Sequence, residues 1–363
     1  MKAIEFDSVT KKFSDGTVAV SELTFGIEAG ETMVLIGPSG SGKTTTLRLL
    51  AGLDYPTAGT IWLNQSNVTQ VEPSNRHVAM MFQSDALYQH MSVRGNLSFG
   101  LTGRKGFWRG RHEGSSKSRV EVEQRIKSVA QRLGIERLLD RKPHQLSGGE
   151  RQRVALGRAM VREPAVFLLD EPLSRLDTRL AGELRSELKR VFRELGVPVL
   201  YVTHNQREAM ALGDRIGVMD DGKIIQFGTP SEIYRCPANL FVANFVGQEP
   251  VNVLSLADQP TAERQTGIPA SAALIGLRAE DLRVADSQGG VGGLSLRVMV
   301  REKEWLGDHT LVHLDACDFG NASLTARCEA NSDLQIGDQV EAKIELEKVL
   351  FFDSAEKRIE PAS

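Results

Sequence analysis

The strongest constraint on this chain is one segment, Gly37-Pro38-Ser39-Gly40-Ser41-Gly42-Lys43-Thr44, which fits the pattern G-x-x-x-x-G-K-[ST] without a mismatch. An apolar run (32–36) precedes it and helical spacing (44–51) follows it, which predicts a glycine-rich loop between a buried strand and a helix. Such a loop converges backbone N–H groups on phosphate. We expect Lys43 to hold the β- and γ-phosphates and the Thr44 hydroxyl to bind Mg²⁺. A flexible Gly-Ser loop would not require these two residues.

A second apolar run, Val166-Phe167-Leu168-Leu169, ends in two carboxylates, Asp170 and Glu171. Asp170 is expected to hold Mg²⁺, as the equivalent acid does in phosphate-loop enzymes. Glu171 is then free to orient and polarise an attacking water as a general base. An Asp-Glu pair after a strand is often only the start of a helix, because acids favour the first turn. Downstream of a phosphate loop, the catalytic interpretation is preferred.

Composition limits the class of protein and the kind of partner. The chain has 363 residues, of which 41% are hydrophobic and 25% charged, and a formal net charge of -3. These values are typical of a globular protein with two domains, and they predict no nucleic-acid partner. No apolar run reaches the roughly 20 residues that span a bilayer, and the N-terminus does not resemble a signal peptide. The three cysteines, Cys236, Cys317 and Cys328, predict neither a disulfide framework nor a zinc site.

The order of patterns indicates an α/β domain followed by a mostly β domain. Helical periodicity over 120–133 and 176–195 alternates with apolar runs at 165–169 and 197–203, as expected for a parallel sheet. After Gly247 the pattern changes to short alternating strands, at 294–300, 310–314, 322–327 and 339–346. We expect a nucleotide-binding domain over 1–236 and a C-terminal domain over 237–363. A basic Gly/Ser-rich stretch, 103–119, has two interpretations, a solvated loop and a contact with lipid or a membrane subunit, of which the loop is preferred.

The segment Leu146-Ser147-Gly148-Gly149-Glu150-Arg151-Gln152-Arg153 resembles the signature motif of ATP-binding-cassette (ABC) ATPases. Ser147 and the two glycines at a helix start offer a hydroxyl and free N–H groups to an anion. The resemblance implies that this anion is the γ-phosphate of ATP held by the opposite subunit of a head-to-tail dimer. A helix cap without function is the alternative. It does not explain why the other family motifs occur in the right order.

Further residues match the family one by one. The resemblance implies that Phe13, with Val18, stacks on adenine, and that Gln83 contacts Mg²⁺ or the lytic water. It also implies that Asp177 crosses the dimer interface and that His204 hydrogen-bonds the γ-phosphate. The expected catalytic residues are Glu171, His204, Gln83 and Lys43, and the expected metal ligands are Thr44, Gln83 and Asp170. The expected nucleotide-binding residues are Phe13, Val18, Gly37, Pro38, Ser39, Gly40, Ser41, Gly42, Lys43, Thr44, Thr45, Gln83, Ser147, Gly148, Gly149 and Asp177.

Two residues depart from the family pattern near the expected dimer interface. Arg175 stands where the family often has Asn or Ala, and Glu150 replaces a frequent Gln. Neither change removes a catalytic group.

The resemblance is closest to the ATPase subunits of carbohydrate-uptake importers, such as that of the maltose importer. It implies a cassette with a mixed sheet and a helical subdomain at about 88–160, followed by a small OB-like barrel of the TOBE type. Residues 275–282 and 350–353 carry the likeness to the barrel, although Ala279 stands where Pro is usual. The barrel domain has two possible functions, dimer scaffolding and regulation, of which scaffolding is preferred. Importers of spermidine, sulfate and iron carry related barrels and remain alternatives.

The implied function is hydrolysis of ATP, with Mg²⁺, to drive uptake of a sugar, polyol or related solute. The implied partners are a second copy or a paralogous ATPase, two membrane permease subunits whose coupling helices sit near 83–91, and, indirectly, a solute-binding protein. The implied location is the cytoplasmic face of the inner membrane. Three alternatives are less favoured. A non-catalytic subunit is disfavoured because Asp170, Glu171, Gln83 and His204 are all present. A soluble ABC protein of DNA repair or translation and an exporter are disfavoured because the sequence shows neither coiled-coil insertions nor membrane spans.

Overall fold

The computed structural model describes residues 2–82, 86–102, 119–258, 267–284 and 293–360. The chain divides into two compact units, Met1–Pro230 and Ser231–Ser363, which are described separately. Among the described residues, no helix is both long and apolar enough to cross a membrane.

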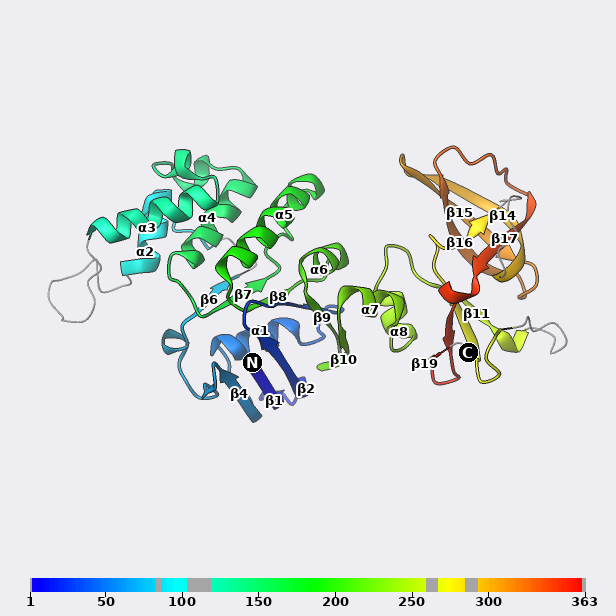
Figure 1. Cartoon of the computed structure of the whole chain (residues 1–363), viewed down its shortest axis with the longest axis horizontal. Helices are drawn as coiled ribbons and strands as arrows, with labels where there is room; N and C mark the ends of the chain where they lie inside the picture. The colour runs from blue at the N-terminus through cyan, green and yellow to red at the C-terminus, as the bar shows by residue number, and fades with distance from the viewer. Residues whose placement is uncertain (1, 83–85, 103–118, 259–266, 285–292, 361–363) are drawn as a thin grey trace. The chain divides into compact units, whose positions relative to one another are not determined.

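The first unit is built on a six-stranded mixed sheet with the strand order β10-β9-β3-β8-β7-β6 (Figure 1). All neighbours in this sheet are parallel except β10 and β9. Strands β3, β7 and β8 are buried at every position, as expected for parallel strands covered on both faces. The strands are β3 (Thr32–Ile36), β6 (Val78–Met81), β7 (Val166–Asp170), β8 (Val199–Val202), β9 (Arg215–Asp220) and β10 (Lys223–Gly228).

A second, antiparallel sheet with the order β2-β1-β4-β5 packs on the same core. Strands β1 and β2 form a hairpin around the turn at 14–16, where Gly16 N donates to Phe13 O. Leu47 and Leu50 of α1 are fully buried in one cluster with Phe6 of β1 and Leu168 of β7, so α1 joins the two sheets through apolar contact. The elements are β1 (Lys2–Lys12), β2 (Val18–Glu28), α1 (Lys43–Ala51), β4 (Ala58–Leu63), β5 (Ser66–Asn67) and the 3-10 turn Pro73–Asn75.

Three helices, α2 (Val93–Thr102), α3 (Arg119–Arg132) and α4 (Gly148–Met160), form a layer of their own (Figure 1). They meet at Gly157, where an added Cβ would lie 3.0 Å from Leu97 and 3.1 Å from Leu133. Only glycine allows this close approach. The layer also contains the 3-10 turns Glu136–Leu138 and Pro143–Gln145, and α5 (Thr178–Leu195) and α6 (Gln206–Leu212) complete the unit. The helices predicted at 120–133 and 176–195 therefore begin within two residues of their observed starts.

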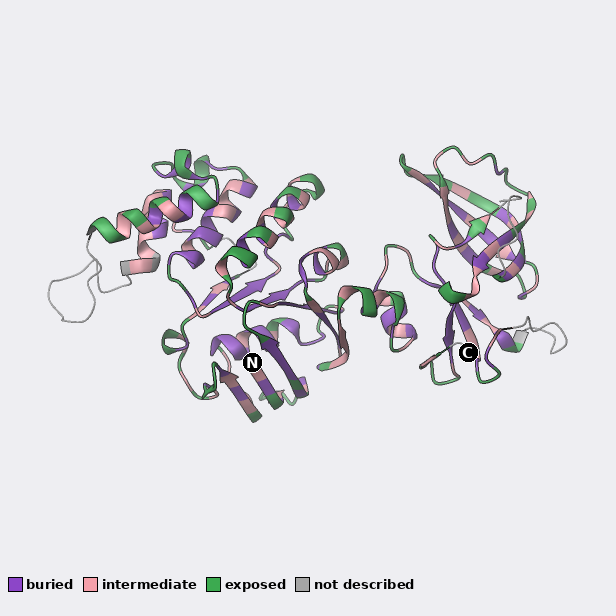
Figure 2. Ribbon diagram, viewed as in Figure 1, coloured by how far each residue is buried: buried purple, intermediate pink, exposed green. Residues whose placement is uncertain are grey.

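The second unit begins with two short helices and continues as an all-antiparallel β structure. Its sheets have the orders β11-β12-β18-β19 and β13-β17-β14-β15-β16, and they enclose one apolar core (Figure 2). The predicted OB-like barrel is thus confirmed. The elements are α7 (Pro230–Arg235), α8 (Leu240–Phe245), β11 (Asn252–Ser255), the 3-10 turn Leu256–Asp258, β12 (Leu274–Leu277), β13 (Arg283–Val284), β14 (Gly293–Trp305), β15 (His309–Ala316), β16 (Ala322–Glu329), β17 (Gln339–Glu345), the 3-10 turn Leu346–Lys348, β18 (Leu350–Phe352) and β19 (Arg358–Ile359).

The strand β14 extends furthest beyond the range that the sequence predicted. The alternating pattern indicated 294–300, whereas β14 continues to Trp305. The register of β14 against β15 shifts between Val300 and Glu302. Such a bulge breaks the two-residue period, so the pattern stops although pairing continues.

Candidate functional site

The glycine-rich loop joins β3 to α1 and is closed by its own lysine. Lys43 is only 6% exposed, and its Nζ donates to Gly37 O at 2.9 Å and Pro38 O at 2.7 Å. Burial lowers the pKa of Lys43, while the carboxylates of Glu171 and Asp170 oppose this shift. A cation held over the loop by carbonyl oxygens, next to the N-terminus of α1, is suited to an anionic phosphate.

Gly42 is the N-cap of α1 and has a φ of 98°. A Cβ at this position would lie 2.3 Å from Ala19 O, so only glycine lets the loop approach β2 so closely. Val18, next to Ala19, is 46% exposed, and Phe13 on the same hairpin is 39% exposed. The structure therefore places two exposed apolar side chains on the strand pair that touches the loop, as a stacking surface for a base requires.

The carboxyl end of β7 brings Asp170 to the start of α1. Thr44 Oγ1 donates to Asp170 Oδ1 over 3.2 Å, although the two residues are 126 positions apart. Burial raises the pKa of Asp170, and the hydrogen bond from Thr44 opposes that shift. A hydroxyl oxygen next to a carboxylate is a donor set that suits a hard cation such as Mg²⁺. The residues present therefore fit the expected metal.

Glu171 and His204 lie together although they come from different loops. His204 Nδ1 is 2.9 Å from Glu171 Oε1, and their side chains are 62% and 19% exposed. Glu171 has a φ of 46°, a region that non-glycine residues seldom adopt outside constrained sites. Its backbone N donates to Val202 O at 2.8 Å, which ties the turn after β7 to the end of β8. A carboxyl group and an imidazole side by side at the edge of the sheet can orient a water and exchange a proton.

The predicted signature residues form the start of α4. Ser147 Oγ accepts from Glu150 N at 3.2 Å, and Glu150 Oε2 accepts from Ser147 N at 2.9 Å, which is a capping box. The hydrogen bonds from Ser147, first that of its backbone N–H, lower the pKa of the Glu150 carboxyl group, and burial opposes this shift. The Ser147 hydroxyl lies at the N-terminus of α4, where an anion is favoured. Glu150 at the position of the usual Gln therefore has a structural use.

The signature helix packs closely on α5 and on the turn before it. A Cβ at Gly149 would lie 2.8 Å from Leu180, and one at Gly148 would lie 3.3 Å from Leu176. Asp177 caps α5 by accepting from Leu180 N at 3.0 Å. Both glycines and Asp177 thus have packing or capping roles within this chain. In the described part of the structure, no hydrogen bond joins Ser147 or Asp177 to the glycine-rich loop of the same chain.

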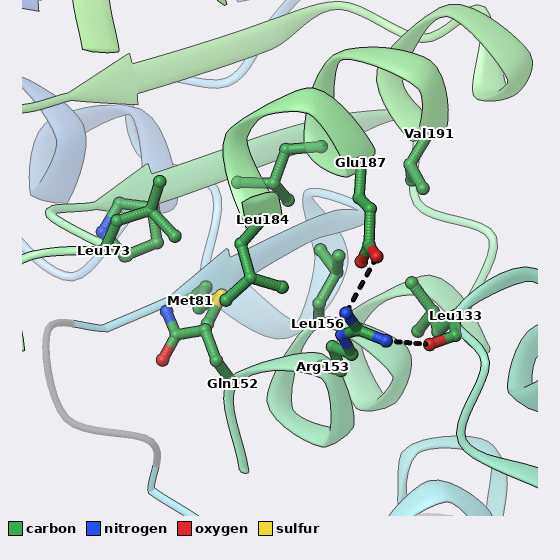
Figure 3. Close-up of a pocket in the computed structure, with 11 residues that line it drawn as sticks. Met81, Leu133, Gln152, Arg153, Leu156, Leu173, Leu184, Glu187 and Val191 are labelled. Carbon is green, nitrogen blue, oxygen red and sulfur yellow. Dashed lines mark hydrogen bonds and ion pairs between the residues drawn. The ribbon is translucent and has the colours of Figure 1, made fainter. Parts of the chain in front are cut away.

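Gln83 lies outside the described residues, as does most of the basic stretch at 103–119. The nearest described position is Phe82, which follows Met81, the last residue of β6. Met81 lines a mainly apolar pocket between α4 and α5 (Figure 3). At this pocket, Arg153 donates to Glu187 at 2.7 Å and to Leu133 O at 3.4 Å. The sequence placed Arg153 in the signature segment, but only the structure shows these two partners.

Sequence reasoning missed Glu208, which is 2% exposed at the start of α6. The only local signal was Asn205 three residues before it, a spacing that predicts a helix cap. Asn205 Oδ1 does accept from Glu208 N at 3.2 Å. Such a pattern can indicate a helix cap, but it carries no information on the burial of the acid.

The loop, the acidic strand end and His204 on a mixed sheet define a phosphate-loop nucleoside triphosphatase. The ABC transporter model matches residues 20–174, and the TOBE domain model matches residues 275–352. The chain is 43% identical to the xylose/arabinose import ATP-binding protein XacK of Haloferax volcanii, over 97% of this chain and 94% of that one. It is 41% identical to the trehalose/maltose import ATP-binding protein MalK of Thermococcus litoralis, over 97% and 98%. It is 42% identical to the sn-glycerol-3-phosphate import ATP-binding protein UgpC of Rhizobium meliloti, over 99% and 100%.

Solved structures agree with this assignment of the fold. The cassette cbiO1 of Clostridium perfringens, part of an ABC transporter complex, matches with a TM-score of 0.57 and 27% identity over 64% of this chain and 90% of its own. A dimeric ATP-binding cassette in a post-hydrolysis state, bound to ADP and Pi, matches with a TM-score of 0.53 and 29% identity over 62% and 98%. The chain therefore belongs to the ABC transporter family. It binds and hydrolyses ATP as a subunit of the importer class, as the sequence predicted.

Proposed function

We propose that this subunit hydrolyses ATP with Glu171 as general base and His204 as its partner at the γ-phosphate. The observation that carries the proposal is the 2.9 Å approach of His204 Nδ1 to Glu171 Oε1, directly after the buried Asp170. The two groups lie on the same edge of the sheet as the end of β3, where the glycine-rich loop begins. Gln83, which is assigned from the sequence alone, completes the proposed catalytic set.

Lys43 and the loop 37–44, with Thr45, would bind the phosphates, while Phe13 and Val18 would pack against the base. Thr44 and Asp170 would hold Mg²⁺, with Gln83 as a further ligand. When bound there, Mg²⁺ neutralises charge on the phosphate oxygens. Glu171 would then orient the attacking water and accept its proton, and His204 would donate a hydrogen bond to a phosphate oxygen.

The second half of the site is proposed to come from another ATPase subunit. The start of α4 carries the Ser147 hydroxyl and the N–H groups of a helix N-terminus, which are groups that bind an anion. Among the described residues, Ser147 makes no hydrogen bond to the glycine-rich loop of its own chain. A dimer that places Ser147, Gly148, Gly149 and Asp177 of one copy opposite the loop of the other would use them. Whether the partner is identical or paralogous does not change this chemistry.

The transported solute is proposed to be a sugar, a polyol or a sugar-like phosphate. The three relatives above are named for import of xylose/arabinose, trehalose/maltose and sn-glycerol-3-phosphate, so small polyhydroxylated solutes are their shared chemistry. Two membrane permease subunits would receive the ATPase near 83–91, on the cytoplasmic face of the membrane. A solute-binding protein would deliver the substrate to them.

The substitution Glu171→Gln tests the catalytic proposal. It keeps the size and one oxygen of the side chain but removes the base, so we expect kcat to fall about 10²- to 10⁴-fold while ATP still binds. Phosphate release and fluorescent-nucleotide binding measure the two effects. Light scattering should also detect a dimer of the ATP-bound variant, because hydrolysis no longer returns the closed dimer to its open state.

The matched control is Glu194→Gln, another Glu-to-Gln change. Glu194 lies on α5, its side chain is 47% exposed, and it pairs with Arg190. This variant should keep wild-type kcat. Wild-type turnover by Glu171→Gln would show that another group is the base. Loss of ATP binding in that variant would show that Glu171 serves binding instead.

A further inference from the structure

A buried carboxylate lies directly below the turn that carries His204. Glu208 Oε2 accepts from Tyr201 Oη at 2.7 Å and from Thr203 Oγ1 at 3.0 Å. Tyr201 is fully buried and Thr203 is 2% exposed. Burial, and next the charge of Glu208, raise the pKa of Tyr201 well above its usual value, so the phenol stays protonated and acts as the donor. Two hydroxyl donors therefore converge on one carboxylate oxygen.

The same network fixes the backbone on both sides of His204. Thr203 Oγ1 accepts from Asn205 N at 2.9 Å, and Asn205 Oδ1 accepts from Glu208 N at 3.2 Å. Thr203 N donates to Leu35 O at 3.2 Å, which ties the turn to β3. Of residues 203–205, only His204 is exposed, and its Nδ1 lies 2.9 Å from Glu171 Oε1. The Glu208 carboxylate holds Thr203 directly and reaches Asn205 through the Thr203 hydroxyl, whereas the bond to Asn205 Oδ1 comes from the backbone N of Glu208.

Packing alone does not account for an acid at this position. An apolar side chain would fill a buried helix face at no electrostatic cost, whereas a buried carboxylate is tolerated only when hydrogen bonds compensate it. The bonds that compensate the Glu208 carboxylate come from Tyr201 at the end of β8 and from Thr203 at the start of the turn. Arg185 adds a positive charge nearby, which opposes the pKa shift of Tyr201. The group is thus arranged to orient the turn.

We propose that Glu208 is a positioning residue for ATP hydrolysis, which holds the turn 203–205 so that His204 meets Glu171 and the phosphate. This inference rests on the proposed function of His204. Glu208 touches neither nucleotide nor water in the mechanism. Its loss should therefore change the chemical step and leave nucleotide affinity in place, because the phosphates are bound by the loop at 37–44.

Two variants of the full-length protein test this inference. Glu208→Ala removes the acceptor, and Thr203→Val removes the hydroxyl that links the acceptor to Asn205 with almost no change in shape. Each should lower kcat about 10- to 100-fold, since a displacement of about 1 Å at a reacting group has effects of this size. The KM for ATP and the Kd of a fluorescent ATP analogue should change less than about threefold. Glu208→Gln should restore most of kcat, because its amide oxygen can accept both hydroxyls.

Lys189→Met is the matched control. Lys189 Nζ donates to Ala211 O at the far end of α6, so this variant loosens the same helix away from the turn and should keep wild-type kcat. Thermal unfolding identifies variants that do not fold, and Thr203→Val keeps the test valid if Glu208→Ala is one of them. Wild-type kcat in a folded Thr203→Val would overturn the inference. An inactive Glu208→Gln, or equal losses in kcat and nucleotide binding, would also overturn it.

His204→Ala, measured in parallel, separates this inference from the function on which it rests. If His204→Ala turns over ATP like the wild type, the proposed role of His204 is wrong. If His204→Ala is impaired while both Glu208→Ala and Thr203→Val are active, only the role of Glu208 is wrong.

Discussion

Asp170→Asn is expected to make the nucleotide-free protein more stable while abolishing its Mg²⁺-dependent activity. Asp170 is 8% exposed, and burial raises its pKa despite the hydrogen bond from Thr44 and the nearby charge of Lys43. A raised pKa means that the folded state disfavours the ionised carboxylate relative to the unfolded state. Asparagine resembles the neutral acid, and its amide oxygen can accept the same Thr44 hydrogen bond.

The direction of the effect follows from proton linkage. Because the folded state disfavours the ionised carboxylate, we expect Asp170→Asn to raise the free energy of unfolding at pH 7. For a unit of this size, each 1 kcal/mol gained would raise Tm by roughly 2–4 °C. The direction of the Asp170 pKa shift also predicts how stability depends on pH. With the folded pKa above the unfolded one, the stability that the protonated Asp170 provides is present below the unfolded pKa and is lost as pH rises through the folded pKa.

Calorimetry of the full-length protein in EDTA, from about pH 4 to pH 7.5, measures this prediction. The Tm difference between Asp170→Asn and wild type should be near zero at the acidic end and should grow with pH. Asp140→Asn is the control, because Asp140 is 89% exposed, and its Tm difference should correspond to no more than about 0.5 kcal/mol. A lower Tm for Asp170→Asn at pH 7, or a difference independent of pH, would refute the argument that burial of this charge is costly.

Two further substitutions test the loop and the signature helix. Gly42→Ala should lower the free energy of unfolding by about 2 kcal/mol or more. The added Cβ would lie 2.3 Å from Ala19 O, and the φ of 98° strains any residue other than glycine. An unchanged urea midpoint would contradict this prediction. Ser147→Ala should lower the free energy of unfolding by about 1 kcal/mol through loss of the helix cap, and it should lower kcat. Ser147→Thr should keep the cap. Equal free energies of unfolding for the wild type and both variants would show that the cap does not stabilise the protein.

The sequence by itself determined the parts of this protein that are local in the chain. The loop 37–44, the acids after 166–169 and the signature at 146–153 are contiguous, and each is bounded by an apolar strand or a helix start that periodicity reveals. The strands of the barrel were found in the same way, because their side chains alternate between core and solvent. Where the alternation breaks at the bulge after Val300, the prediction ended too early.

Tertiary structure alone decided which of these local parts meet. Thr44 contacts Asp170 across 126 positions, and Glu171 contacts His204 across 33, because β3, β8 and β7 are neighbours in the sheet. Strand order depends on the packing of the whole core, which no short segment encodes. The burial of Glu208 was hidden for the same reason. Its spacing from Asn205 indicated a helix cap, and only the fold placed Tyr201 and Thr203 around its carboxylate.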